Sequence, residues 1–221
     1  MLAALVLLAA STSHASSVNG RPYQVVWPEG RPAGIIVFLH GMSRDPLVEE
    51  EDGISAIAAL ATNRGLVAVF PLAGAACPDD QRCWDTDEIA GELKQIDQVV
   101  RAVEDTLGQP LTHREIIGFS SGGFLIGGAL QRGLLNGYAR AGILAGGPVG
   151  TSGPPSARGE PPAVYLEVGK NDDSQHDSTL QLARILARAW PKSVGLRENG
   201  GGHALDPEDV SQFLMWFWGE G

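Results

Sequence analysis

A serine flanked by glycines stands between two apolar segments of this sequence. Gly118, Ser120 and Gly122 match the spacing G-x-S-x-G, and Ser121 follows the first serine. At a sharp strand-to-helix turn such glycines let the two backbones approach closely and hold the serine out for reaction. With 29 glycines in the chain the spacing arises easily by chance, but a strand pattern precedes it and a helix pattern follows. Because Ser121 has Phe119 where the motif requires glycine, Ser120 is the candidate nucleophile.

A serine hydroxyl needs a base to accept its proton. Of the five histidines, His203 lies in a glycine-rich turn between the last predicted strand and the last predicted helix. A base on such a turn can reach the serine, so we predict that His203 is this base. The alternative is a loop histidine that only contacts the helix start. The other histidines lie in the N-terminal segment, at an early strand end, before the serine strand and in a polar loop: His14, His40, His113 and His176.

The base in turn needs a carboxylate that orients it and stabilises its charged form. The segment after a predicted strand ending at Gly169 offers Asp172, Asp173 and Asp177. We favour Asp172, three residues after that glycine, and Asp173 is the main alternative. For most of these carboxylates the competing interpretation is a solvated turn.

A reaction at a carbonyl also needs donors for the negative oxygen that develops, and backbone N–H groups are the usual source. One candidate is the N–H of Ser121 at the predicted helix start. The other is the N–H of Met42, which follows Gly41 in the loop after an early apolar strand. On this hypothesis the Met42 side chain lines the pocket for the acyl group, whereas ordinary core packing of Met42 predicts no convergence with Ser120.

Strand and helix patterns alternate along the chain and predict a single α/β domain with a mostly parallel open sheet and helices on both faces. The predicted strands are residues 34–41, 66–71, 114–119, 141–146, 162–169 and 193–199. The predicted helices are residues 53–65, 88–107, the segment after Ser120, 179–190 and 207–218. Residues 146–162 are rich in proline and glycine and read as a surface loop, so we expect no substantial lid.

Composition restricts the classes of function. Hydrophobic residues make up 43% of the 221 residues and charged residues 19%, which is typical of a soluble globular protein. The formal net charge is -10 and no basic run is present, which argues against nucleic acid as a partner.

The N-terminus predicts an export signal. The apolar run in residues 2–10 is too short to span a bilayer, and Ser13-His14-Ala15 fits a small-x-small cleavage site. We therefore interpret residues 1–15 as a signal peptide and residues 16–221 as the catalytic domain, exported to the periplasm or secreted. A truncated start would explain the missing basic region. The alternative is a native first helix.

Two cysteines lie six residues apart in a polar loop. In an exported protein, Cys77 and Cys83 can form a local disulfide, with two free thiols as the alternative. No suitably spaced ligands nearby indicate a metal site. Trp84 follows in the same loop and is a candidate wall of the substrate pocket together with Phe119. Packing of Trp84 over the disulfide is equally consistent with its position.

The segments "FLHGMSRD", "IIGFSSGG", "AGILAGG", "LEVGKNDD" and "GGGH", in this order, resemble the α/β-hydrolase superfamily from about Tyr23 onward. The similarity is to phospholipase/carboxylesterase proteins, including acyl-protein thioesterases, and to secreted polyhydroxybutyrate-depolymerase-like and feruloyl esterases. The resemblance implies hydrolysis of carboxylic esters without a cofactor. It implies Ser120, Asp172 and His203 as the catalytic triad, and Met42 and Ser121 as the oxyanion donors. After Asp172 the common Val-Pro is replaced by "DSQHD", which makes the acid the least secure assignment.

Four functions are compatible with these observations. The leading hypothesis is a monomeric exported serine esterase that acts on small esters. The second is a depolymerase for polyesters or plant-wall esters. A peptidase or amidase could use the same residues, and a binding protein could retain the scaffold without catalysis.

Overall fold

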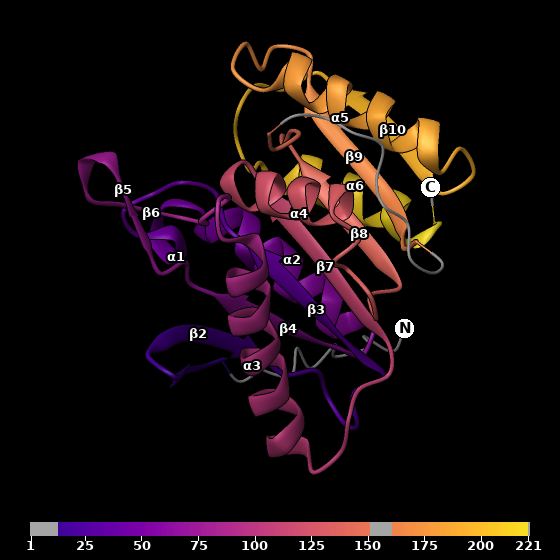
Figure 1. Ribbon diagram of the computed structural model, residues 1–221. Helices are drawn as coiled ribbons and strands as arrows, with labels where there is room; N and C mark the ends of the chain where they lie inside the picture. The colour runs from indigo at the N-terminus through magenta and orange to yellow at the C-terminus, as the bar shows by residue number, and fades with distance from the viewer. Residues whose placement is uncertain (1–12, 151–160, 221) are drawn as a thin grey trace, which may run out of the picture.

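The structure is a computed structural model that describes residues 13–150 and 161–220. One eight-stranded sheet crosses the molecule in the order β1-β2-β4-β3-β7-β8-β9-β10 (Figure 1). Strands β1 and β2 pair antiparallel at one edge, and the six strands from β4 to β10 in this order are parallel. The strands are β1 (Ser13–Val18), β2 (Arg21–Val26), β3 (Gly34–Leu39), β4 (Leu66–Pro71), β7 (Arg114–Phe119), β8 (Arg140–Leu144), β9 (Ala163–Gly169) and β10 (Val194–Asn199). The predicted mostly parallel sheet is confirmed.

Helices cover both faces of this sheet, as predicted. In Figure 1, α3 (Ile89–Leu107), α4 (Ser121–Gln131) and α5 (His176–Ala189) lie in front of it, and α2 (Glu51–Asn63) and α6 (Pro207–Trp218) lie behind. Strand β3 is apolar on both sides: Ile35 and Val37 pack in the front core, whereas Ile36 and Phe38 pack in the rear core. A continuous apolar strand is required where helices cover both faces.

The structure adds elements that the sequence patterns did not predict. The polar loop after β4 contains a small hairpin of β5 (Ala75–Cys77) and β6 (Gln81–Cys83), joined by the 3-10 turn Pro78–Asp80. A short helix, α1 (Pro46–Glu49), precedes α2, and α5 begins at His176 rather than Thr179. These elements are too short or too polar to show an apolar period.

Two predictions fall partly outside the described residues. Residues 1–12 of the predicted signal peptide are not described, and β1 already begins at Ser13, within the predicted signal. Residues 151–160 of the predicted surface loop also lie outside the described ranges. Within residues 13–150 and 161–220, no helix is long and apolar enough to cross a membrane.

The parallel strands bring distant segments to one edge of the sheet. The candidate site residues follow the carboxyl ends of β3, β7, β9 and β10, and these ends lie at the same edge. This is the edge at which open α/β sheets bind ligands.

Candidate active site

Ser120 stands on a strained turn between β7 and α4. Its backbone has φ 47° and ψ −111°, a left-handed φ that a serine rarely adopts. The turn depends on close backbone packing, because a Cβ on Gly122 would come within 2.2 Å of the Leu39 carbonyl oxygen. The Ser120 N–H donates to the Leu144 carbonyl oxygen at 2.9 Å, which ties the turn to β8. The glycine spacing that predicted a sharp turn is therefore required by the close backbone packing at Ser120.

Three side chains from three loops form one line of hydrogen bonds. His203 Nε2 lies 3.0 Å from Ser120 Oγ, and His203 Nδ1 lies 2.8 Å from Asp172 Oδ2. Asp172 is 1% exposed, whereas the His203 side chain is 34% exposed. In this arrangement the imidazole can accept the proton of the serine hydroxyl, and the buried carboxylate can stabilise the imidazolium that results.

The structure distinguishes between the two candidate carboxylates. Asp172 points to His203, and Asp173 is exposed to solvent. The second oxygen of Asp172, Oδ1, accepts hydrogen bonds from the Ser174 N–H, the Ser174 hydroxyl and the Gln175 N–H at 3.1, 2.7 and 2.9 Å. Burial alone would raise the pKa of this carboxyl, but the hydrogen bonds that it accepts outweigh burial and leave its pKa below the usual value. Asp172 is therefore ionised at neutral pH.

The loop that carries His203 is held by polar contacts to the loop after β9. The Asn171 N–H donates to the Gly201 carbonyl oxygen at 2.9 Å, and the Asn171 side-chain amide donates to the Gly200 carbonyl oxygen at 2.8 Å. The ring of Phe119 stacks on His203, with centroids 5.1 Å apart and planes 28° apart. These contacts fix the imidazole relative to both of its hydrogen-bond partners.

The loop after β3 places Met42 beside the candidate nucleophile. Met42, Ser120, His203 and Phe119 line one cleft of about 550 Å³. Among the described residues, the N–H groups of Met42 and Ser121 have no hydrogen-bond acceptor in the protein. Two unoccupied backbone donors next to a reactive serine are what the oxyanion hypothesis requires.

Two titratable residues that the sequence did not single out support this loop, the half-buried Glu50 and the buried His40. The Gly41 N–H donates to Glu50 Oε1 at 2.8 Å, and a Cβ at position 41 would come equally close to that oxygen. Burial raises the pKa of Glu50 to about 7, and its buried Oε2 has no partner among the described residues.

On the other side of the loop, His40 Nε2 accepts the Ala73 N–H at 2.9 Å. Burial lowers the pKa of His40 to about 4, so its ring is neutral and Nδ1 donates to the Gly41 carbonyl oxygen.

The cleft wall is acidic and partly apolar. Met42 and Val48 are its exposed apolar side chains, at 50% and 65% exposure. The carboxylates on its lining are Glu49, Glu50, Glu51, Asp52 and Asp206, and no lysine or arginine lies among the described lining residues. No group of three or more potential metal ligands occurs in residues 13–150 and 161–220.

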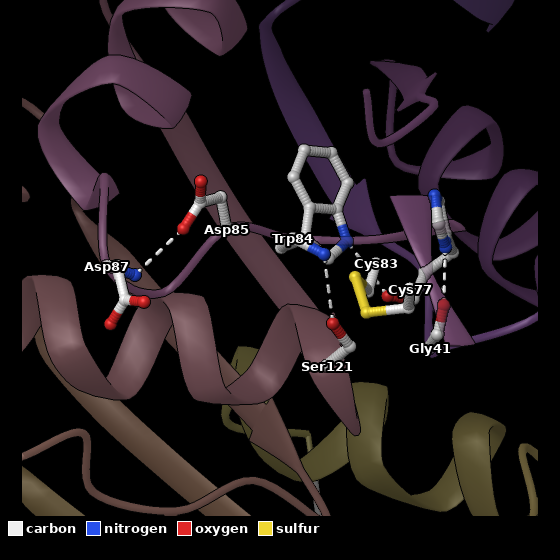
Figure 2. Close-up of a disulfide and its surroundings, with 8 residues drawn as sticks. Gly41, Cys77, Cys83, Trp84, Asp85, Asp87 and Ser121 are labelled. Carbon is white, nitrogen blue, oxygen red and sulfur yellow. Dashed lines mark hydrogen bonds between the residues drawn. A yellow bond between two sulfur atoms is a disulfide. The ribbon is translucent and has the colours of Figure 1, made fainter. Parts of the chain in front are cut away.

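Cys77 and Cys83 form a disulfide, so the free-thiol alternative is excluded in this structure. Figure 2 shows Trp84 next to this disulfide, with its indole directed away from Ser121. Trp84 is 3% exposed, and its ring packs 5.2 Å from that of His40. It is not among the described residues that line the cleft, whereas Phe119 is. The indole of Trp84 therefore packs in the core on the α3 and α4 side of the sheet and not in the pocket wall. It lies behind the loop after β3, residues 40–45, which we call the Met42 loop.

No protein-family model matches this sequence, and comparison with curated proteins finds no match. Many solved structures share its fold. An acetyl xylan esterase from Aspergillus awamori superposes with a TM-score of 0.70 at 14% identity, covering 95% of this chain and 100% of the other. A carboxylesterase from Mesorhizobium loti has a TM-score of 0.66 at 17% identity, covering 93% and 99%. A ferulic acid esterase has a TM-score of 0.68 at 15% identity, covering 94% and 97%. The chain thus has the α/β-hydrolase fold that these esterases share.

Proposed function

We propose that this protein is a serine hydrolase of carboxylic esters. The observation that carries the proposal is the line of two hydrogen bonds from Ser120 through His203 to the buried Asp172, at 3.0 and 2.8 Å. The fold shared with several esterases supports ester bonds as the target. The cleft beside Ser120 is large enough for a small ester, and its apolar side chains offer a surface for an acyl or aryl group.

In the proposed reaction Ser120 Oγ attacks the ester carbonyl carbon while His203 Nε2 accepts the hydroxyl proton. The carbonyl oxygen becomes an oxyanion that the N–H groups of Met42 and Ser121 stabilise. The tetrahedral intermediate collapses, the C–O bond to the alcohol breaks, and His203 returns the proton to the leaving oxygen. Water then attacks the acyl-enzyme by the same steps, releases the acid and restores Ser120. Ionised Asp172 stabilises the imidazolium in both halves of the cycle.

The test is hydrolysis of p-nitrophenyl esters from acetate to palmitate by the wild type, Ser120→Ala and Ser121→Ala. We expect Ser120→Ala to lower kcat/KM by roughly 10⁴-fold or more. Ser121→Ala is the comparison at the neighbouring serine: it keeps the backbone N–H but removes the hydroxyl that accepts the Trp84 N–H at 3.0 Å, so we expect a loss of no more than about 10-fold. A fluorophosphonate probe that labels the folded wild type on Ser120 supports the same assignment. A folded wild type that neither turns over an ester nor reacts with the probe would leave only the silent scaffold.

A second candidate substrate is an ester on a polymer. The exposed positions of Met42 and Val48 at the cleft favour it, because an extended chain can lie across an apolar rim. Release of acids from polyester films and from feruloylated arabinoxylan, compared with p-nitrophenyl acetate, separates this function from small-ester hydrolysis.

We also propose that the protein is exported, which the Cys77–Cys83 disulfide and the apolar N-terminal run support. Cleavage after Ala15 would leave Ser16, Ser17 and Val18 to pair with β2. N-terminal sequencing of protein recovered outside the cytoplasm tests this. A mature chain that retains residues 1–15 in the cytoplasm would contradict it.

A further inference from the structure

The disulfide-closed hairpin β5–β6 covers very little apolar core. Its residues from Ala75 to Arg82 are exposed or half-buried, and only Cys83 at its end is buried. An isolated two-stranded hairpin of three-residue strands is marginal in water. The disulfide joins Cys77 at the turn end of β5 to Cys83 at the open end of β6, so this covalent bond determines whether the hairpin keeps its shape. The contacts of the hairpin indicate what that shape is for.

The hairpin and Trp84, the residue that follows it, hold the Met42 loop on both sides of Met42. Beyond it in sequence, the Ser43 N–H donates to the Arg82 carbonyl oxygen at 3.3 Å, and the Arg82 N–H donates to the Ser43 carbonyl oxygen at 2.7 Å. Before it, the indole N–H of Trp84 donates to the His40 carbonyl oxygen at 2.9 Å. The loop is thus bonded, on either side of Gly41 and Met42, to Arg82 and Trp84, which are the two chain neighbours of Cys83.

The same segment also holds the second oxyanion donor. The backbone N–H of Trp84 donates to the hydroxyl of Ser121 at 3.0 Å (Figure 2). The His40 carbonyl oxygen that accepts the Trp84 indole also accepts the Gly122 N–H at 3.1 Å. Trp84 therefore bridges the loop after β3 and the start of α4, which carry the two candidate donors.

We propose that the Cys77–Cys83 hairpin and Trp84 form a positioning element that keeps the N–H groups of Met42 and Ser121 converged on the oxyanion. This inference rests on the proposed esterase function and assigns the disulfide a role in turnover although neither cysteine lines the cleft. Cys77 is only half-buried, so a reductant can reach the bond. In the part of the chain that the structure describes, neither the hairpin nor Trp84 makes a hydrogen bond to Asp172 or His203, so the element acts on transition-state stabilisation and not on the base.

The main test compares the double variant Cys77→Ser/Cys83→Ser with the wild type on p-nitrophenyl acetate. We expect kcat to fall about 10-fold or more, with KM changed less than twofold, because the lost interactions act only in the transition state. A trifluoromethyl ketone that forms a hemiketal oxyanion on Ser120 should bind more weakly by the same factor. Circular dichroism and the melting temperature show that the variant is folded at the assay temperature. A folded variant with wild-type kcat and inhibitor affinity would overturn the inference.

A second pair of variants keeps the disulfide. Trp84→Phe retains an aromatic ring and the backbone N–H but removes the indole donor to His40, and we expect kcat to fall about threefold to 10-fold. Trp190→Phe is the matched control: Trp190 is also buried, at 8% exposure, and its indole N–H has no partner among the described residues. We expect Trp190→Phe to keep the wild-type kcat. Equal kcat for Trp84→Phe and the wild type would contradict the role of the indole.

The outcomes for the hairpin and for the proposed function are separable. Wild-type turnover that Ser120→Ala abolishes supports the esterase function whatever the hairpin variants do. Unchanged kcat in the hairpin variants then overturns the positioning role alone. An inactive, probe-resistant wild type overturns both.

Discussion

The two sides of Ser120 are built by different means. On one side, His203 and Asp172 act through their side chains, and two hydrogen bonds join them to the serine. On the other side, the candidate donors are backbone N–H groups of Met42 and Ser121, which belong to the main chain and not to the side chains of these residues. Glu50, His40 and the disulfide hairpin hold these N–H groups in position through their hydrogen bonds to the Met42 loop.

This difference shows where each side is vulnerable. A substitution on the base side removes a reacting or charged group directly. On the oxyanion side, damage comes from residues that never meet the substrate, because they hold the backbone in position. Substitution of His203 or Asp172, on the base side, should therefore cause a large loss of activity. Substitutions on the oxyanion side, among the residues that hold the Met42 and Ser121 N–H groups, should each cause a smaller loss.

The largest effect should come from Asp172. Asp172→Asn removes the negative charge and presents an amide to His203 Nδ1, which favours the wrong tautomer of the ring. We expect kcat to fall about 10⁴-fold. Asp173→Asn is the control, and it should stay within about threefold of the wild type because Asp173 is exposed. Comparable losses in the two variants would contradict the assignment of the acid.

On the oxyanion side, Glu50 should affect stability in a pH-dependent way. Its pKa of about 7 in the folded protein lies above the unfolded value of 4.5, so the folded state retains a proton that the unfolded chain has lost. The folded state therefore loses stability as pH rises from 4.5 to 7, and the loss is complete above pH 7. At one pKa unit per about 1.4 kcal/mol, this loss is at most about 3 kcal/mol.

Glu50→Gln cannot ionise and should lack this loss. Urea denaturation of both proteins at pH 4.5, 6 and 8 measures the difference in unfolding free energy between variant and wild type. That difference should shift in favour of Glu50→Gln as pH rises. A difference independent of pH would show that Glu50 titrates normally.

The activity of Glu50 variants should depend on whether the new side chain keeps a hydrogen-bond acceptor for the Gly41 N–H. Glu50→Ala leaves the Gly41 N–H without its partner and frees the Met42 loop, so we expect kcat to fall about 10-fold with little change in KM. Glu50→Gln retains an amide oxygen at the position of Oε1 and should stay close to the wild type at pH 6. Equal activity of the two variants would show that the hydrogen bond to Gly41 does not position the loop.

The smallest effect should come from the charge of the cleft rim. Its carboxylates should repel an anionic ester, so kcat/KM for 4-acetoxybenzoate should be about threefold lower than for its methyl ester at low salt. At 0.5 M NaCl the difference should shrink, because screening acts on exposed charges. A ratio that does not respond to salt would assign the preference to shape and not to charge.

Much of the fold and of the base side could be predicted from the sequence. Continuous apolar runs identified the buried strands, and glycines at fixed spacing identified the turn at Ser120, because both patterns arise from local backbone and packing requirements. Glu50, His40 and Trp84 gave no such signal. Each acts through contacts with segments that only the folded chain brings near, and the β5–β6 hairpin is too short and polar to show a period.

The sequence by itself determined the positions of the six parallel strands along the chain, the strained turn and the residue types available for a triad, since these depend on neighbouring residues. Only the tertiary structure decided that Asp172 rather than Asp173 meets His203, because the two differ by one position and point in different directions from the same loop. It also decided that Trp84 lies behind the Met42 loop, because the packing of the loop after β4 against β3 and α4 sets the direction of that side chain.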